Sequence, residues 1–371
     1  MGTKVCHLTT VHQRYDVRIF HKECKSLSRA GFEVNLIVAD GLGDEEKDCI
    51  KIWDVGKPSG RKERMLKFGK KALQKALEID AQIYHFHDPE LIPVGLKLKK
   101  HGKKVIYDVH EDVPLQLRYK PYMNKFLARI VSDFFKAYEH KAVRKFDYLF
   151  VSVPSIQKRL ERYNRNILQI RNYPKIQEEF KRDFDWESKI YDLCYIGGIS
   201  RNRGIVQIVK ALEQVEATLH LAGPFLESGL EQELKSFRAW NKVVYHGVLD
   251  RAEVVDLLYK TKIGLVTLLP TKNYQASLPI KLFEYMSAGL AVVASNFPYW
   301  QELIEENKIG LRVDPTKPEE IASAIRYLLE NEDKAKEFGS NAFRVVREKY
   351  SWTNEEKKLI STYKKLSKQE N

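Results

Sequence analysis

A strand, a glycine turn and the start of a helix follow one another in Tyr195-Ile196-Gly197-Gly198-Ile199-Ser200-Arg201-Asn202-Arg203-Gly204-Ile205. The glycines let the backbone approach a ligand closely, the helix start offers free N–H groups, and arginine supplies forked donors to phosphate oxygens. The segment therefore favours a diphosphate ligand. It is neither G-x-G-x-x-G nor a Walker loop, which argues against a nicotinamide cofactor and against ATP. A tight turn with solvent-facing arginines is the alternative.

Short strands alternate with helices on both sides of this segment. We expect strands at residues 4–8, 33–38, 82–87, 104–109 and 148–153 in the first half, and at 192–196, 218–222, 242–245, 262–267, 290–294 and 310–313 in the second. Such alternation is typical of parallel sheets. The chain is therefore predicted to be α/β, with two doubly wound, Rossmann-like domains. Because such sheets bind ligands at the carboxyl ends of their strands, we expect the domains to face one another across a cleft.

Glycine and proline mark several expected boundaries. Gly31 follows the amphipathic segment 18–30 and precedes a strand, as a glycine at the end of a helix does. Pro318 opens an apolar helical stripe at 317–331. Residues 173–188 are rich in charge and have no clean period, so we expect a linker there.

Composition excludes several classes of protein. The chain has 371 residues, 43% of them hydrophobic, and a net charge of +13, which excludes a disordered chain and predicts two domains with cores of their own. No export signal, no apolar run of roughly 20 residues and no nucleic-acid-binding motif is apparent. A disulfide framework or zinc ribbon is not expected, and a reducing cytoplasm fits, because no C-x-x-C pair occurs among Cys6, Cys24, Cys49 and Cys194.

The positive charge is densest at residues 57–77, where Leu66, Leu73 and Leu77 recur near helical spacing between lysines and arginines. Residues 97–104 and 118–129 add further positive charge. A basic amphipathic helix of this kind binds anionic lipid, and the alternative is an ordinary solvated helix face. We favour contact with a membrane or with an anionic acceptor.

A second candidate ligand site lies at residues 277–295, where a helix is followed by an apolar strand. Lys281 and Glu284 are three residues apart and share one helix face. A lysine near a helix N-terminus suits phosphate, and a carboxylate one turn later can accept both hydroxyls of a ribose. An ordinary surface pair between these two residues is the alternative.

In the first half, two expected strands end in histidines and acids. Alternation places His85 and His87 on one face of the first strand, and Asp108 and His110 on one face of the second. A metal cluster is conceivable here but is disfavoured, because the spacing is not that of a zinc motif. Polar side chains that bind sugar hydroxyls are expected here instead, and histidines that merely cap strand ends are the plainer alternative.

These residues resemble the family 4 (group 1) glycosyltransferases, which have the GT-B fold and depend on nucleotide-sugar donors. The resemblance covers nearly the whole chain, and its most specific part is Pro279-Ile280-Lys281-Leu282-Phe283-Glu284-Tyr285-Met286-Ser287-Ala288-Gly289. It also includes Asp16-Val17-Arg18-Ile19-Phe20-His21-Lys22-Glu23, His87-Asp88-Pro89, Asp108-Val109-His110-Glu111 and Ser351-Trp352.

The resemblance implies roles for particular residues. Glu284 would hold the donor ribose, Lys281 and Arg203 would lie near the diphosphate, and His110 would lie by the transferred sugar. We expect His110, Lys281 and Arg203 to take part in catalysis. The expected donor-binding residues are Gly197, Gly198, Arg201, Arg203, Gly204, Lys281, Leu282 and Glu284, and the expected acceptor-side residues are Asp16, Arg18, His87, Asp88 and Glu111.

Two positions depart from the family pattern. Gly198 stands where many members have arginine, so Arg201 would neutralise phosphate in its place. Ala276 stands eight residues before Glu284, where the family has a first carboxylate, and this bears on how the donor sugar is held. The resemblance also implies retention at the anomeric carbon, with no obligatory metal and no cofactor.

The resemblance implies an acceptor-side domain at 1–175, a nucleotide-sugar-binding domain at 176–350, and a helix at 351–371 that crosses back to the first domain. We expect a cytoplasmic enzyme, with peripheral attachment to the inner face of the membrane as a further expectation. It would move a hexose or acetamidohexose from an NDP-sugar, UDP foremost, to a saccharide or lipid-linked saccharide in polysaccharide or glycoconjugate biosynthesis. An epimerase or sugar phosphorylase of the same architecture and a non-catalytic sugar-nucleotide or polyanion-binding protein are the alternatives.

Overall fold

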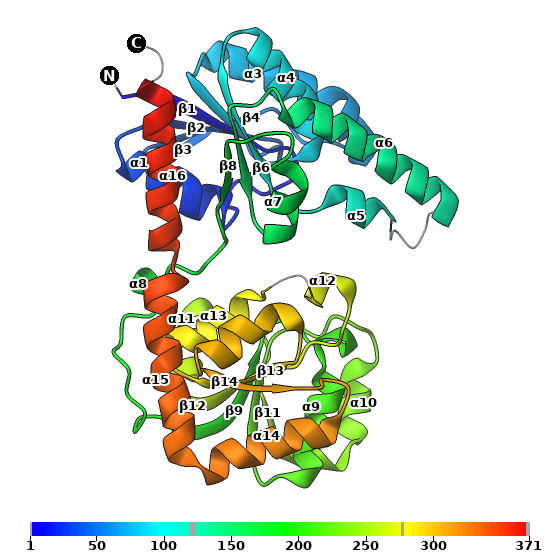
Figure 1. The fold of residues 1–371 in the computed structure, drawn as a ribbon, viewed down its shortest axis with the longest axis vertical. Coiled ribbons are helices and arrows are strands. Elements are labelled where there is room, and N and C mark those ends of the chain that lie inside the picture. The colour runs from blue at the N-terminus through cyan, green and yellow to red at the C-terminus, as the bar shows by residue number, and fades with distance from the viewer. Residues whose placement is uncertain (1, 119–123, 276–277, 369–371) are drawn as a thin grey trace. The chain divides into compact units, whose positions relative to one another are not determined.

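The structure is a computed structural model that describes residues 2–118, 124–275 and 278–368. The chain forms two compact units, residues 1–172 together with 353–371, and residues 173–352. Each unit contains one sheet with helices on its faces (Figure 1). The predicted α/β class is therefore confirmed in both halves of the chain.

The first unit has an eight-stranded sheet in the order β3-β4-β2-β1-β5-β6-β7-β8. Its strands pair in parallel except for β3 with β4, which are antiparallel. Strands β3, β4 and β8 were not predicted. The strand bounds are β1 Lys4–Leu8, β2 Glu33–Val38, β3 Glu45–Lys47, β4 Ile50–Asp54, β5 Ile83–Phe86, β6 Lys104–Val109, β7 Tyr148–Val151 and β8 Ile167–Gln169.

Helices cover both faces of this sheet. Helices α3 (Gly69–Ile79), α4 (Ile92–Lys100) and α6 (Lys125–Val143) pack on one face through an apolar cluster that includes Ala72, Leu98 and Ala142. The opposite face carries the side chains of His7 and His85, which contact Tyr363 of helix α16 (Trp352–Ser367). The chain end therefore completes the first unit. The remaining helices of this unit are α1 Lys25–Arg29, α2 Arg61–Glu63, α5 Val113–Arg118 and α7 Pro154–Leu160.

The second unit has a six-stranded, wholly parallel sheet in the order β11-β10-β9-β12-β13-β14. Alternate residues of its central strands face two separate apolar clusters, as Leu193 and Cys194 do. Burial on both faces explains why these strands read as nearly continuous apolar runs. Their bounds are β9 Tyr191–Ile196, β10 Leu219–Ala222, β11 Val243–Tyr245, β12 Thr261–Val266, β13 Ala291–Ser295 and β14 Gly310–Val313.

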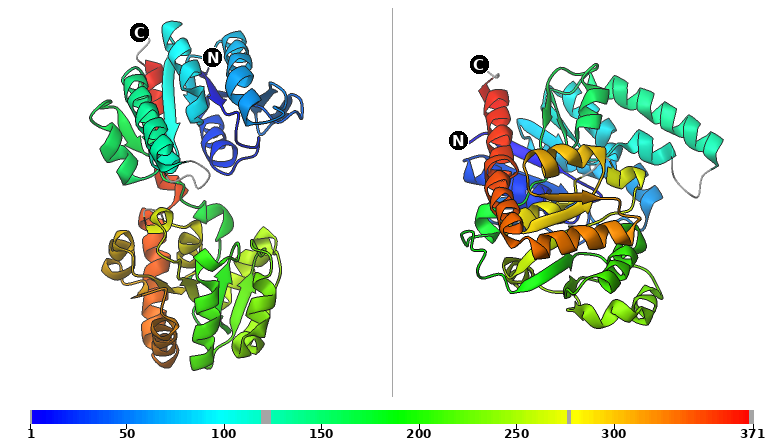
Figure 2. Two further views of the ribbon diagram at one scale, coloured as in Figure 1. Left: turned by 90° about the vertical axis from the view of Figure 1, so that its right-hand side faces the viewer. Right: turned by 60° about the horizontal axis from the view of Figure 1, so that its bottom comes forward.

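The helices of the second unit form a layer on each side of its sheet, as the two orientations of Figure 2 show. One layer contains α9 (Ile205–Ala211), α10 (Leu230–Ser236) and α14 (Pro318–Glu330), and the other contains α11 (Arg251–Tyr259), α13 (Ile280–Ser287) and α15 (Glu332–Lys349). The short helices α8 (Ile176–Glu179) and α12 (Lys272–Gln275) also belong to this unit.

The expected linker at 173–188 is not a free connection. Tyr173, Ile176, Phe180 and Trp186 are each at most 4% exposed and belong to the apolar clusters of the second unit. Their spacing follows neither a helix nor a strand, so no periodic pattern indicated their burial. The unit boundary accordingly lies between residues 172 and 173, slightly earlier than expected.

Two further sequence expectations concern the cysteines and the membrane. All four cysteines are free, and Cys6, Cys24 and Cys194 are buried. Within the described residues, no helix has both the length and the apolar content needed to cross a bilayer.

Candidate active site

The glycine turn after β9 is held in a conformation that requires glycine. Gly204 has φ +78°, and a Cβ atom there would lie 1.9 Å from the carbonyl oxygen of Thr267. Gly197 has φ +111°, which also lies in the region that favours glycine. The turn therefore brings its backbone closer to neighbouring strands than any side chain would allow.

Lys281 at the start of α13 points its ammonium at this turn. A Cβ atom on Gly197 would lie 3.5 Å from Lys281 Nζ, and Nζ lies 3.6 Å from the centre of the Tyr195 ring. The side chain is buried and Nζ has no hydrogen-bond partner in the described part of the chain. Burial, with Arg203 adding to it, lowers the pKa of Lys281 to about 7. A buried amine without a counter-charge, beside a glycine turn, is suited to an anionic ligand.

Arg203 lies on the other side of the same turn. Its Nη1 donates to the carbonyl oxygen of Gly198 at 3.0 Å, and no carboxylate lies within 4 Å of its guanidinium among the residues described. Lys281 and Arg203 thus converge on the Gly197–Gly198 backbone from α13 and from the turn before α9. The structure therefore brings together two of the residues that were expected near the diphosphate.

Glu284 lies one turn further along α13 and is paired with Arg251, whose Nη1 lies 2.7 Å from Oε1 of Glu284. Arg251 also pairs with Glu179. The surface pair between Lys281 and Glu284 that was the alternative is therefore absent here. Arg251 instead fixes the orientation of the carboxylate.

The side chains of two expected donor-binding residues do not point at the glycine turn. Arg201 is 48% exposed and is held in ion pairs with Glu227 and Glu233. Leu282 is fully buried in the apolar core of the second unit. The family departure at Ala276 lies outside the described residues.

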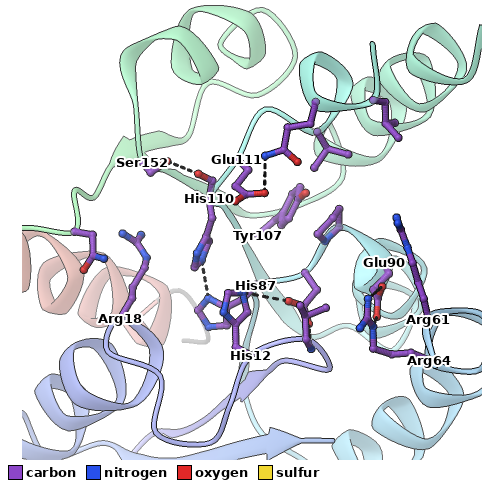
Figure 3. Close-up of a pocket in the computed structure, with 17 residues that line it drawn as sticks. His12, Arg18, Arg61, Arg64, His87, Glu90, Tyr107, His110, Glu111 and Ser152 are labelled. Atoms are coloured by element: carbon purple, nitrogen blue, oxygen red, sulfur yellow. Dashed lines mark hydrogen bonds and ion pairs between the residues drawn. The ribbon is translucent and has the colours of Figure 1, made fainter. Parts of the chain in front are cut away.

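The first unit contains a pocket of about 490 Å³ at the carboxyl ends of β5 and β6. Arg18, His87, Asp88, His110 and Glu111 of the expected set line it. Figure 3 shows His110 and Arg18 on one side of this pocket, and Arg61 and Arg64 beside Glu90 on the other. Five expected residues are therefore gathered at one site.

His110 is held by buried neighbours. Its Nε2 lies 3.0 Å from Asp108 Oδ2 and 3.1 Å from His87 Nδ1, and its backbone carbonyl accepts from Ser152 Oγ at 2.7 Å. Although burial acts in the opposite direction, Arg18 and His110 hold the pKa of Asp108 well below its usual range. Asp108 therefore stays ionised and fixes the imidazole, which is 19% exposed to the pocket.

Arg18 has a supporting position rather than an exposed one. Its guanidinium donates to both carboxylate oxygens of Asp108 at 3.0 Å and to the carbonyl oxygen of Ile170 at 3.0 Å. Asp16 accepts from the backbone N–H groups of Arg18 and Ile19, and does not line the pocket. Asp16 thus stabilises the chain turn that presents Arg18.

Asp88 organises the loop that follows β1. It accepts from the backbone N–H groups of Thr10 at 2.5 Å and Val11 at 3.2 Å. This places His12 at the pocket, 3.6 Å from Asp88 and with its ring centre 5.5 Å from that of His110. The hydrogen bond to Asp16, together with nearby Asp88, raises the pKa of His12.

The basic segment 57–77, which was expected to contact a membrane, lies partly at this pocket. Arg61 and Arg64 line the pocket, and Arg64 pairs with Glu90 at 2.7 Å. Leu73 and Leu77 pack against the core of the first unit, whereas Leu66 is 73% exposed. The three leucines therefore form no shared lipid-facing stripe, and the two arginines line the pocket.

Two family comparisons decide the chain's identity. Residues 17–172 match "Glycosyltransferase Family 4" and residues 176–345 match "Glycosyl transferases group 1". The chain is a family 4, group 1 glycosyltransferase. It has the GT-B fold of that family, with one Rossmann-like domain in each half.

Individual proteins of similar sequence are also named as glycosyltransferases. An uncharacterized glycosyltransferase of Methanocaldococcus jannaschii is 25% identical over 289 residues, which are 73% of this chain and 69% of that protein. A putative teichuronic acid biosynthesis glycosyltransferase of Bacillus subtilis is 32% identical over 107 residues, 29% of this chain and 27% of that one.

Solved structures show the same fold. A glycosyltransferase from Rickettsia africae is 15% identical, with a TM-score of 0.76 over 99% of both chains. HepE of Anabaena, solved in complex with UDP, is 16% identical, with a TM-score of 0.74 over 98% of this chain and 100% of that one. At these identities the likeness shows the fold alone.

Among the pocket residues that the sequence did not indicate are three cationic or titratable ones, His12, Arg61 and Arg64. All three lie in loops or irregular helical turns, where spacing carries no periodic signal. The signal available for His12 was the run Thr9-Thr10-Val11-His12 directly after a strand, since the carboxyl ends of parallel strands carry sites.

Proposed function

We propose that this glycosyltransferase moves a hexose or acetamidohexose from an NDP-sugar, with UDP as the foremost donor base, to a saccharide or lipid-linked saccharide. The observation that carries the proposal is the buried, unpaired ammonium of Lys281 beside Gly197 and Arg203. Two positive side chains on a close-approach backbone turn provide what a diphosphate requires. HepE, a structural neighbour, binds UDP.

The proposed donor site uses Lys281 and Arg203 to stabilise the diphosphate as it departs. Positive groups fixed before the reaction stabilise developing negative charge without reorganisation. A divalent ion at the diphosphate is not required in this proposal. Glu284, oriented by Arg251, would accept the hydroxyls of the ribose.

The proposed acceptor side is the pocket of the first unit. His110, held by Asp108 and His87, would lie beside the transferred sugar, and Arg61 with Arg64 would contact an anionic group of the acceptor. Retention at the anomeric carbon is part of the proposal and is tested by the NMR coupling of the product's anomeric proton.

The donor proposal is tested by two arginines that lie two residues apart. Arg203→Met should weaken UDP binding by about tenfold or more, because a charge-assisted contact to phosphate is lost. Arg201→Met is the matched control and should change the affinity much less, because Glu227 and Glu233 already hold that guanidinium. Calorimetric titration with UDP measures both. Equal losses, or no loss at Arg203, would contradict the assignment.

We also propose that the enzyme works in the cytoplasm, attached to an anionic membrane surface through α6 rather than through residues 57–77. Phe126, Leu127, Ile130 and Phe134 are 50–77% exposed, and their spacing places them within an arc of about 100° on one side of the helix. Exposed apolar side chains gathered in this way mark an interaction surface.

Charge favours an anionic lipid surface as the occupant of this helix face. Lys125, Arg129 and Lys136 follow the neighbouring arc of α6, and Asp133 is neutralised by Arg118 at 2.5 Å. An apolar arc with cationic residues along its edge is typical of helices that lie in the membrane interface. A lipid-linked acceptor would be available at that surface.

A further inference from the structure

A cluster of three histidines and one glutamate is enclosed in the first unit, on the face of the sheet that α16 covers. It comprises His7 of β1, Glu23 of the helical segment 19–24, His85 of β5 and His87 directly after β5. All four side chains are at most 2% exposed. Three of the four, His7, Glu23 and His85, have no place in the proposed transfer reaction.

The four residues converge on one point. Oε2 of Glu23 lies 3.9 Å from His7 Nδ1, 3.8 Å from His85 Nδ1 and 3.9 Å from His87 Nε2. His7 Nδ1 and His87 Nε2 are 3.0 Å apart. Nitrogen and oxygen ligands at about 2.0–2.1 Å from a tetrahedral zinc ion lie about 3.4 Å from one another. These four separations bracket that value, and one ligand atom from each residue lies within 4.8 Å of all the others, so modest side-chain shifts would complete the site.

Glu23 supplies the one carboxylate of the cluster. Its Oε2 is buried without a hydrogen-bond partner among the described residues. One guanidinium, that of Arg18, faces both Glu23 and Asp108 at 3.0 and 2.8 Å. Two buried carboxylates thus share one cation, and a buried charge without compensation is costly.

Two rings also have the outer contacts typical of metal-bound histidine. His7 Nε2 lies 3.1 Å from the Tyr363 hydroxyl, and His87 Nδ1 lies 3.5 Å from Asp108 Oδ2. Partners on the second nitrogen fix which nitrogen is free to bind an ion. Tyr363 Oη also lies 2.8 Å from His85 Nδ1, and this contact would have to lengthen when an ion binds.

We propose that His7, Glu23, His85 and His87 bind one divalent transition-metal ion, with zinc as the foremost candidate. A buried set of three nitrogens and one carboxylate oxygen, closed to solvent, is suited to zinc as a structural ion. The ion would fix His87, and through it the orientation of His110. This proposal is independent of the donor site, because all four residues belong to the first unit.

The test measures metal in protein purified without a polyhistidine tag and dialysed against EDTA. We expect about one zinc per chain by plasma mass spectrometry, and intense visible absorption after replacement by Co²⁺. Glu23→Gln and His85→Gln should lower the bound zinc by about tenfold or more. His220→Gln is the matched control, because His220 pairs with His246 in the other unit at 2.9 Å and should leave the zinc content unchanged.

Several outcomes would overturn the proposal. Wild-type protein that stays below a tenth of an equivalent after incubation with Zn²⁺, Co²⁺ and Mn²⁺ would show that Glu23 is neutralised by a proton instead. Zinc retained by Glu23→Gln or His85→Gln would show an adventitious ion elsewhere. If neither variant folds, X-ray absorption at the zinc edge of the wild type decides, because imidazole scattering is expected and a shell without histidine would contradict the site.

Discussion

Lys281 is the residue at which stability and function oppose each other most clearly. Its pKa is lowered from 10.5 to about 7, so the unfolded chain binds a proton more tightly than the folded one. The resulting penalty on folding is fully present below pH 7 and disappears as the pH rises toward 10.5, because stability rises wherever the unfolded state binds more protons. The fold tolerates this penalty in the absence of ligand.

Lys281→Met should therefore raise the free energy of unfolding by roughly 2–4 kcal/mol at pH 7 while abolishing UDP binding. The advantage of the variant should be largest below pH 7 and should shrink at higher pH. Urea denaturation at several pH values measures it. A variant that is less stable than wild type at pH 6 would contradict the burial of an unpaired ammonium.

Gly204 tests the close approach of the turn to β12. Gly204→Ala should cost about 2–4 kcal/mol of unfolding free energy, because the new Cβ both meets the Thr267 carbonyl and requires positive φ. Gly229→Ala is the matched control, since Gly229 has φ +77° with no atom within 4 Å of its Cβ position, and should cost only about 1–2 kcal/mol. Equal costs would show that the turn can relax away from β12.

Strands with a clear apolar pattern could be predicted from the sequence, and strands without such a pattern could not. Strands β1, β2, β6 and β14 have the predicted bounds, because each is an apolar run closed by a turn or polar residue. By contrast, β3 (Glu45–Lys47) consists of charged residues at the sheet edge, where one-sided pairing imposes no apolar pattern.

In the segment 18–30, the helix was predicted but its internal geometry was not. It is helical as predicted, but residues 19–24 form a π-helical turn before α1 begins at Lys25. This turn buries Glu23 and Lys22 together with Ile19 and Phe20. A period of 3.6 residues does not reveal which charged residues such a turn directs inward.

The exposed apolar face of helix α6 leads to a prediction about membrane binding. Phe126→Ser with Phe134→Ser should reduce co-sedimentation with vesicles of phosphatidylglycerol and phosphatidylcholine by about tenfold, because two large apolar side chains no longer enter the interface. Leu42→Ser with Val248→Ser is the matched control, since these residues are 71% and 73% exposed elsewhere. Binding that is unchanged in the α6 variant, or absent in wild type, would contradict the membrane proposal.

In the whole molecule, one folded unit is built from two separate stretches of the chain. Residues 353–371 belong to the first unit although they follow the second in sequence. Leu359, Tyr363 and Leu366 are at most 1% exposed in that unit. No local pattern in the sequence specifies which sheet a terminal helix covers, so this placement rested on family resemblance.

The candidate site was predictable to a similar degree. Motif residues at strand ends, such as His110 and Asp88, line the expected pocket. Arg201 was expected at the diphosphate because it lies in the same motif as Arg203, yet its partners Glu227 and Glu233 come from later in the chain. Spacing identifies which residues can reach a ligand, and long-range ion pairs decide how each charged side chain is oriented.

We propose that this protein binds a nucleoside diphosphate through Lys281 and Arg203 without a metal at that site. The thermal midpoint of the protein, measured with UDP, GDP, ADP, UMP and NAD, each with and without EDTA, tests this proposal. We predict that one diphosphate, UDP foremost, raises the midpoint equally under both conditions, because a ligand bound only by the folded state stabilises it. No rise with any diphosphate, or a rise that EDTA abolishes, would contradict the claim.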